Sequence, residues 1–216
     1  MDKHVFRRVL VLAPHTDDGE FGCGGSIARL VEEGADVYYV AFSIAEKSVP
    51  EGLPKDILST EVKLATNALG IPQENLTIFK YEVRDFPDHR QEILEDMILL
   101  ARRINPTAVF LPSRYDTHQD HQVISNAGFR AFKRTSLFGY EIAWNNLTFD
   151  TQAFVTFSER HLQKKIDAIK AYASQSGRNY GSEEFVRSLA NVRGVQIGAE
   201  FAEVFEVMRF VYNEIR

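Results

Sequence analysis

Short apolar runs alternate with amphipathic segments along the first half of the chain. The runs, rich in Val, Leu, Ile and Phe, predict strands at 9–13, 37–42, 76–79 and 108–111. Apolar positions three or four residues apart predict helices at 26–33, 57–69 and 91–104. Strands that alternate with helices predict right-handed crossovers, and therefore an α/β fold with a mainly parallel sheet covered by helices on both faces.

The second half continues this pattern less regularly. It predicts a helix at 123–132, a strand at 138–142, an edge strand at 153–157, a helix at 160–172 and a polar loop at 174–181. The tail "VFEVMRFVY" alternates poorly, and we interpret it as a last strand. Because no repeat, low-complexity tract or linker divides the chain, we expect a single domain over residues 1–216.

Composition and charge exclude several classes of protein. The apolar fraction of 44% and the charged fraction of 25% are those of an ordinary globular protein. A net charge of -5 argues against nucleic acid or an anionic membrane as the main partner. The few apolar residues before Pro14 are too short a run for a signal peptide, and no run reaches the roughly 20 residues of a spanning helix. With one cysteine, Cys23, in the chain, we expect a cytoplasmic protein without membrane insertion.

Acidic and histidine residues follow two of the predicted strands. "HTDD", residues 15–18, follows the strand at 9–13, and "YDTHQDHQ", residues 115–122, follows the strand at 108–111. In open α/β sheets the ligand crevice lies beyond the carboxyl ends of the strands, so both stretches meet at one site if the strands are near neighbours. Carboxylates so close together repel one another, which indicates a cation or a hydrogen-bond network that holds them.

The residue types in these stretches suit a metal site. His15, Asp18 and His121 form a set of two histidines and one carboxylate, which is suited to zinc with a fourth position open for water. Another divalent metal is the alternative. Asp17 is left as a free carboxylate where a general base would be needed. His118 and His121 are three residues apart at a helix start, so both can face the same side.

Two other functions stay open on these residues alone. The stretch "GCGGS" would suit the phosphate-binding turn of a nucleotide-binding protein, but it lacks the full GxGxxG spacing. A non-catalytic metal- or sugar-binding domain would keep the ligands without turnover, although it has no need of a spare base such as Asp17. A pair of aspartates is also common in solvated turns and helix caps. The joint occurrence of both stretches after predicted strands favours the metal site.

The two stretches also resemble the motifs of a known family. "HTDDGEFGCGGSIARLVEEGADV" resembles the opening motif of the LmbE/PIG-L de-N-acetylases, HPDDxExGxGG, and "HQDH" resembles their second motif, HPDH. "EVKLATNALGI", "HRQEI" and "KKIDAIKAYASQ" are similar to the connecting segments, so the resemblance covers most of the first 180 residues. It implies a Rossmann-like three-layer sandwich and a zinc-dependent enzyme that removes acetyl groups from N-acetylglucosamine-type sugars or sugar conjugates.

The resemblance also implies a role for each matching residue. It makes His15, Asp18 and His121 the zinc ligands, Asp17 the general base, His118 the stabiliser of the oxyanion, and Asp120 the carboxylate that orients His118. We expect Asp120 to raise the pKa of His118 by favouring its charged form.

The chain departs from the family pattern at two places. Thr16 replaces the usual proline, and no arginine precedes the second helix near 58–61, where glycoside-acting members often have one. Candidate sugar contacts are Arg84, Asp85, Trp144 and Asn145. The expected partner is a small N-acetylated sugar or glycoconjugate, with no nucleic acid, and a homo-oligomer is compatible with the sequence.

Overall fold

In the computed structural model, which describes residues 6–212, the strands form one seven-stranded sheet in the order β3-β2-β1-β4-β5-β7-β6. The strands are β1 (Arg8–Ala13), β2 (Asp36–Ala41), β3 (Leu76–Ile78), β4 (Ala108–Pro112), β5 (Ser136–Tyr140), β6 (Ala153–Phe157) and β7 (Phe201–Arg209). The pairs from β3 to β5 are parallel, whereas β7 runs antiparallel to both β5 and β6. The expected mainly parallel sheet is therefore confirmed.

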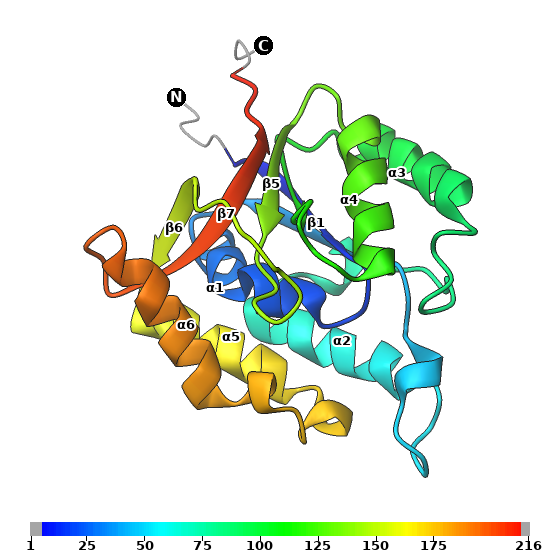
Figure 1. Ribbon diagram of the computed structural model, residues 1–216, viewed down its shortest axis with the longest axis horizontal. Helices are drawn as coiled ribbons and strands as arrows, with labels where there is room; N and C mark the ends of the chain where they lie inside the picture. Colours follow the sequence, from blue (N-terminus) through cyan, green and yellow to red (C-terminus); the bar gives the residue numbers. More distant parts are fainter. Residues whose placement is uncertain (1–5, 213–216) are drawn as a thin grey trace.

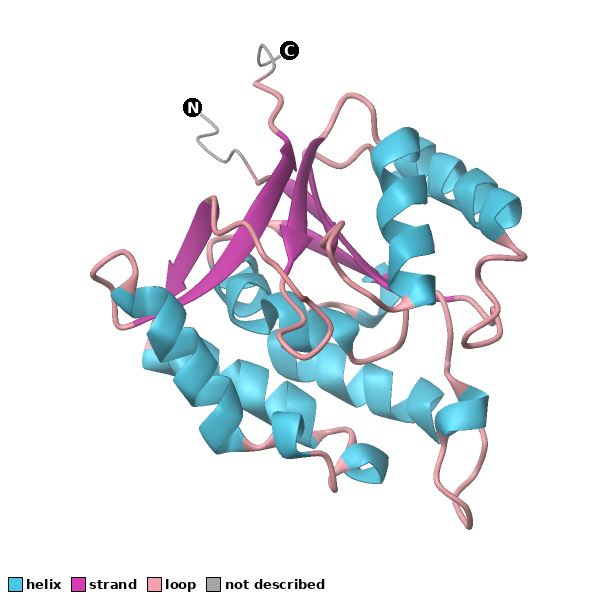
Figure 2. Cartoon of the chain, viewed as in Figure 1, coloured by secondary structure: helices cyan, strands magenta, loops and turns pink. Residues whose placement is uncertain are grey.

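Helices cover both faces of this sheet (Figures 1 and 2). They are α1 (Asp18–Glu32), α2 (Ile57–Leu69), α3 (Arg90–Ile104), α4 (Gln119–Ala131), α5 (Glu159–Lys170) and α6 (Glu183–Val195). Val9 and Val11 of β1 pack into one core with α1, α2 and α5, and Leu10 and Leu12 pack into a second core with α3 and α4. A strand buried on both faces has a continuous apolar sequence, as β1 does. The expected three-layer sandwich is confirmed.

Two helices differ from the sequence prediction. Helix α1 begins at Asp18 rather than near residue 26, and the stretch "GCGGS" lies at a kink inside it, where Cys23 has a non-helical φ of -149°. Helix α6, which the sequence analysis did not predict, begins after Ser182, whose side chain accepts a hydrogen bond from the backbone N–H of Phe185. Its apolar side packs with α5 and β7 in a third cluster. None of the helices described between residues 6 and 212 is long and apolar enough to cross a membrane.

Helix α1 approaches the sheet closely at Gly22. A Cβ atom at this position would lie 2.3 Å from the ring of Tyr140, whose side chain is fully buried and whose hydroxyl donates to the carbonyl of Leu12. Neither the ring nor the helix backbone can move without disturbing its neighbours.

We therefore expect Gly22→Ala to destabilise the protein by about 1–3 kcal/mol, the usual cost of an overpacked core. Thermal denaturation measures this loss. Gly177→Ala is the matched control, because a Cβ there meets nothing within 4 Å and the glycine does not have a positive φ. An equal change in the melting temperature of the two variants would contradict the close approach.

Candidate active site

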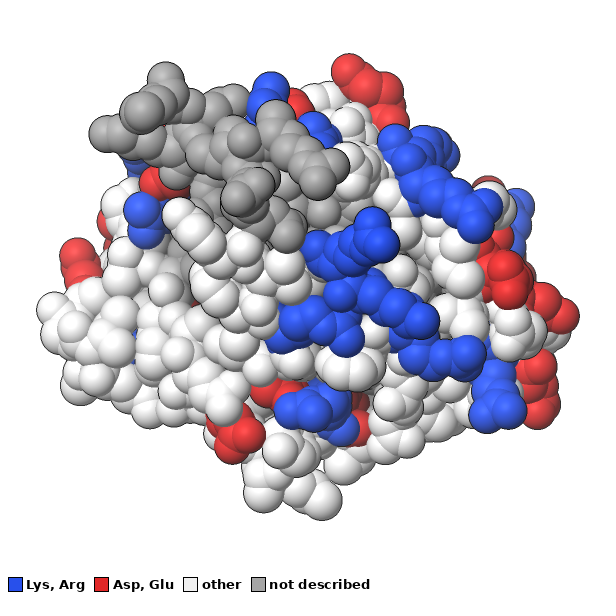
Figure 3. Space-filling view, turned by 90° about the horizontal axis from the view of Figure 1, so that it is seen from above, with Lys and Arg blue, Asp and Glu red and all other residues white. Residues whose placement is uncertain are grey.

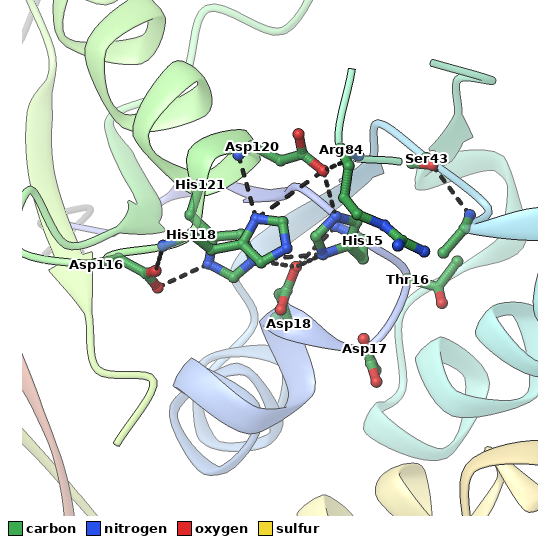
Figure 4. A network of polar contacts seen from close by, with 12 residues as sticks. His15, Thr16, Asp17, Asp18, Ser43, Arg84, Asp116, His118, Asp120 and His121 are labelled. Carbon is green, nitrogen blue, oxygen red and sulfur yellow. Dashed lines mark hydrogen bonds and ion pairs between the residues drawn. The ribbon is translucent and has the colours of Figure 1, made fainter. Parts of the chain in front are cut away.

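Sheet pairing brings the two motif stretches together. Strand β1 pairs directly with β4, with Val9 opposite Ala108, so the loops that follow the two strands meet at one edge of the sheet. The first loop leads into α1 and carries His15 and Asp17. The second leads into α4, whose N-cap is His118. Figure 4 shows His15 and His118 close together, whereas Asp17 lies apart from them, below the cluster.

Three side-chain atoms form a compact triangle in this site. Asp18 Oδ2 lies 3.2 Å from His15 Nδ1 and 3.3 Å from His121 Nε2, and the two nitrogens are 3.3 Å apart. A tetrahedral zinc ion with bonds of about 2.0–2.1 Å separates its ligand atoms by about 3.3–3.4 Å. The donor types and their spacing therefore fit a tetrahedral divalent metal.

Each histidine of the triangle has a carboxylate on its other ring nitrogen. His15 Nε2 lies 2.9 Å from Asp120 Oδ2, and His121 Nδ1 lies 2.7 Å from Asp116 Oδ2. Both carboxylates are buried. A carboxylate in this place holds the proton on the outer nitrogen and leaves the inner nitrogen free to bind a metal. Asp116 had no role in the sequence analysis, although it lies inside the second motif stretch.

Asp120 has a different partner from the expected one. Its carboxylate contacts His15 and lies 4.0 Å from His118 Nδ1, which instead accepts a hydrogen bond from the backbone N–H of Asp120. Burial lowers the pKa of His118, and so do the neighbouring rings of His121 and His15; Asp120 acts in the opposite direction but is outweighed. The prediction that Asp120 raises the pKa of His118 above its usual value is therefore wrong, because the Asp120 carboxylate is hydrogen-bonded to His15 instead.

His118 is nevertheless placed close to the triangle. One nitrogen from each of His15, His118 and His121 lies within 4.8 Å of the others, so these three histidines are a second donor set that could hold a metal. With Nδ1 of His118 accepting a hydrogen bond, the neutral ring carries its proton on Nε2. His118 can therefore donate a hydrogen bond into the cleft without becoming charged.

The carboxylates give the site a strong preference for positive charge. Burial lowers the pKa of His15, but Asp18 and Asp120 raise it more, to about 9. Burial likewise lowers the pKa of His121, while Asp18 and Asp116 raise it to about 10. Burial and the negative charge of Asp18 raise the pKa of Asp17, against the opposing effect of Arg178. A divalent cation would supply the positive charge that these groups favour.

The site opens into a cleft that is lined by residues of both motif stretches and by the loops that follow β5 and α5. Trp144 stacks on Tyr180 with ring centroids 3.9 Å apart, and the edge of Phe21 meets both rings. Of the candidate sugar contacts, Arg84, Trp144 and Asn145 line this cleft, and Asp85 is not among its lining residues. The sequence analysis missed Arg178 and Tyr180, although both lie in the polar loop that it identified.

Two tyrosines hold the loop that carries Asp17. The carbonyl of Thr16 accepts hydrogen bonds from Tyr39 and Tyr172, at 2.9 and 2.6 Å. Both hydroxyls also contact Glu20, whose pKa burial raises to about 8. The hydrogen bonds fix the backbone at Thr16, which occupies the position of the proline in the motif that this stretch resembles.

A layered α/β sheet with a histidine- and carboxylate-rich cleft beyond β1 and β4 defines a class of candidate metalloenzymes. Residues 10–132, which include both motif stretches, match the PIG-L family, described as GlcNAc-PI de-N-acetylase. The chain therefore belongs to this family of enzymes.

Individual relatives are similar along most of the chain. A diacetylchitobiose deacetylase of Thermococcus kodakarensis is 24% identical over 91% of this chain and 81% of its own length. A probable N-acetyl-alpha-D-glucosaminyl L-malate deacetylase of Bacillus anthracis is 26% identical over 78% of this chain and 81% of its own length. Among solved structures, N,N'-diacetylchitobiose deacetylase from Pyrococcus horikoshii has the same fold, with a TM-score of 0.80, 22% identity, and coverage of 94% of this chain and 84% of that chain.

Proposed function

We propose that this protein is a divalent-metal-dependent hydrolase, with zinc as the expected metal, that removes the N-acetyl group from an N-acetylglucosamine-type sugar or sugar conjugate. The observation that carries the proposal is the triangle of His15, Asp18 and His121 atoms with a further carboxylate, Asp17, on the same cleft. A domain that only binds a metal or sugar has no need of the extra carboxylate. The names of the relatives support the sugar class.

In this proposal each side chain has a separate task. His15, Asp18 and His121 hold the metal, which when bound polarises a carbonyl group and lowers the pKa of water. Asp17 accepts the proton of the attacking water and then returns it to the departing amine, so that acetate and a free amino sugar leave. His118 donates a hydrogen bond to the carbonyl oxygen as its negative charge develops.

The carboxylates behind the site act through the histidines. Asp120 orients His15 and Asp116 orients His121, each by a hydrogen bond to the ring nitrogen that faces away from the triangle. The aromatic pair of Trp144 and Tyr180 offers a flat apolar surface for a sugar ring. The group attached to the sugar is left open, because one relative is named for a neutral disaccharide and the other for a malate conjugate.

The nucleotide-binding alternative loses its main support in the structure. The backbone N–H groups of Gly25 and Ser26 donate to the buried carboxylate of Glu203, at 2.9 and 2.7 Å. They are therefore occupied and cannot cradle a phosphate.

Three expectations from the sequence stay predictions. They are a single domain over residues 1–216, a cytoplasmic location and a homo-oligomeric state.

The test of this proposal is metal removal combined with a panel of N-acetylated sugars. We expect the protein to release free amine from at least one N-acetylglucosamine derivative, to lose this activity on chelation and to regain it with zinc. Elemental analysis before and after chelation measures the metal. Full activity of the metal-free protein would contradict the mechanism, and a metal-loaded protein inactive on the whole panel would favour a binding domain.

A further inference from the structure

Arg84 has a backbone conformation that its side chain disfavours. Its φ is +74°, in the left-handed region, and the other non-glycine residues with positive φ among residues 6–212 are Ala45 and Asn105. A Cβ atom makes this conformation costly, whereas glycine adopts it freely. Strain of this kind is retained where a side chain has a use, and Arg84 lines the active-site cleft.

The position of Arg84 is fixed by its neighbours. Val83 and Phe86 are buried on either side of it, with exposed fractions of 6% and 0%. Its backbone N–H donates to Asp120 Oδ2 at 2.7 Å, and the same oxygen lies 2.9 Å from His15 Nε2. A single carboxylate oxygen thus ties the backbone of Arg84 to a proposed metal ligand, and Figure 4 shows the arginine side chain beside the His15 ring.

The positive charge of Arg84 lacks a counter-charge within the described part of the chain. Its side chain is exposed and forms no ion pair with a carboxylate of residues 6–212; its one side-chain hydrogen bond within that range is a long one of 3.4 Å to the hydroxyl of Ser48. The second arginine of the cleft differs. Arg178 lies 3.8 Å from Asp17 and over the ring of Tyr180. Of the two guanidinium groups in the cleft, that of Arg178 therefore has a carboxylate and an aromatic ring as partners, whereas that of Arg84 has no carboxylate partner among residues 6–212.

We propose that Arg84 binds an anionic group, a carboxylate or a phosphate, on the part of the substrate that is attached to the N-acetylated sugar. A guanidinium presents paired N–H donors that match the oxygens of either group. The choice of sugar rests on the proposed function, but the charge preference rests on Arg84 alone. The substrate class becomes an acidic N-acetylglucosamine conjugate rather than a neutral oligosaccharide.

Calorimetric titration of the metal-free protein, which should not hydrolyse its ligands, tests this proposal with three ligands. They are N-acetylglucosamine 1-phosphate, the carboxymethyl glycoside of N-acetylglucosamine and its neutral methyl glycoside. We expect one or both anionic ligands to bind about 10-fold more tightly than the neutral one, which is typical of a charge-assisted hydrogen bond. The ligand that shows the preference distinguishes a phosphate from a carboxylate.

The decisive variant is Arg84→Gly, which removes the guanidinium but keeps the N–H that donates to Asp120. Because glycine adopts a positive φ freely, the melting temperature of the Arg84→Gly variant should equal or exceed that of the wild type. The preference for anionic ligands should disappear, so that the three ligands bind this variant with affinities within about twofold of one another.

Arg134→Gln is the control for net charge. Arg134 is exposed and lies just before the start of β5, whereas the cleft lies beyond the ends of β1 and β4. Figure 3 shows that many other Lys and Arg side chains are exposed on the face seen from above. This variant should keep the preference. The proposal is overturned if the wild type binds all three ligands equally or if Arg84→Gly keeps the preference. Amine release from the same ligands is scored separately, so that an inactive protein with an intact binding preference refutes the proposed function and not this inference.

Discussion

Asp17→Asn is expected to lower kcat by about 100-fold or more while the metal content stays at the wild-type value. The size of this effect is that of a lost general base, because an amide cannot accept the proton of the attacking water. Asp17 lines the cleft, and its one described ion-pair partner within residues 6–212 is Arg178, at 3.8 Å. Its carboxylate is therefore free of the metal triangle, and steady-state kinetics with elemental analysis measures the two quantities together.

Asp18→Asn is the matched control for this prediction. Asp18 Oδ2 belongs to the triangle with His15 Nδ1 and His121 Nε2, so its substitution should lower metal content and activity together. If Asp17→Asn loses the metal and Asp18→Asn keeps it, the two aspartates exchange roles. If both variants keep full activity, the proposed chemistry is wrong.

The parallel half of the fold could be predicted because its strands are buried on both faces. Their apolar runs are continuous and the helices between them end at clear stop signals, such as Gly70 after α2 and Asn105 after α3, both with positive φ. Helix α6 was missed although Ser182 is a good N-cap, because the preceding polar loop and Gly194 near its end obscure the helical pattern. The kink of α1 depends on residues from α5 and β7, which lie far away in the sequence.

The sequence predicted which two stretches converge at the candidate site, but it did not predict all of the hydrogen bonds between their side chains. The expectation that "HTDD" and "YDTHQDHQ" converge needed only the pairing of β1 with β4. The partner of Asp120 depended on where the register of that pairing puts His15, 105 residues away in the sequence. The geometry of the Arg84 loop could not be predicted either, because a positive φ at an arginine has no local sequence signal.

Lys165→Met is expected to destabilise the protein by about 3–5 kcal/mol, because it leaves a buried carboxylate without its counter-charge. Lys165 Nζ lies 2.7 Å from Glu203 Oε1 and donates to the carbonyl of Phe21 at 2.6 Å; both charged side chains are at most 7% exposed. Glu203 in turn accepts the N–H groups of Gly25 and Ser26. Lys165 thus binds a backbone carbonyl before the α1 kink at Cys23, and Glu203 binds two backbone N–H groups after it. The ion pair therefore stabilises the kinked helix, which begins with Asp18.

Urea denaturation of Lys165→Met and Lys170→Met separates this buried pair from an ordinary surface pair. Lys170 lies on the same helix and pairs with Glu183, but both side chains are largely exposed, so its loss should cost less than about 1 kcal/mol. Adding Glu203→Gln to Lys165→Met should recover part of the stability, because a neutral amide oxygen can still accept an N–H of the kink without burying an unpaired charge. Equal losses in the two lysine variants, or a double variant less stable than Lys165→Met alone, would show that the ion pair does not support α1.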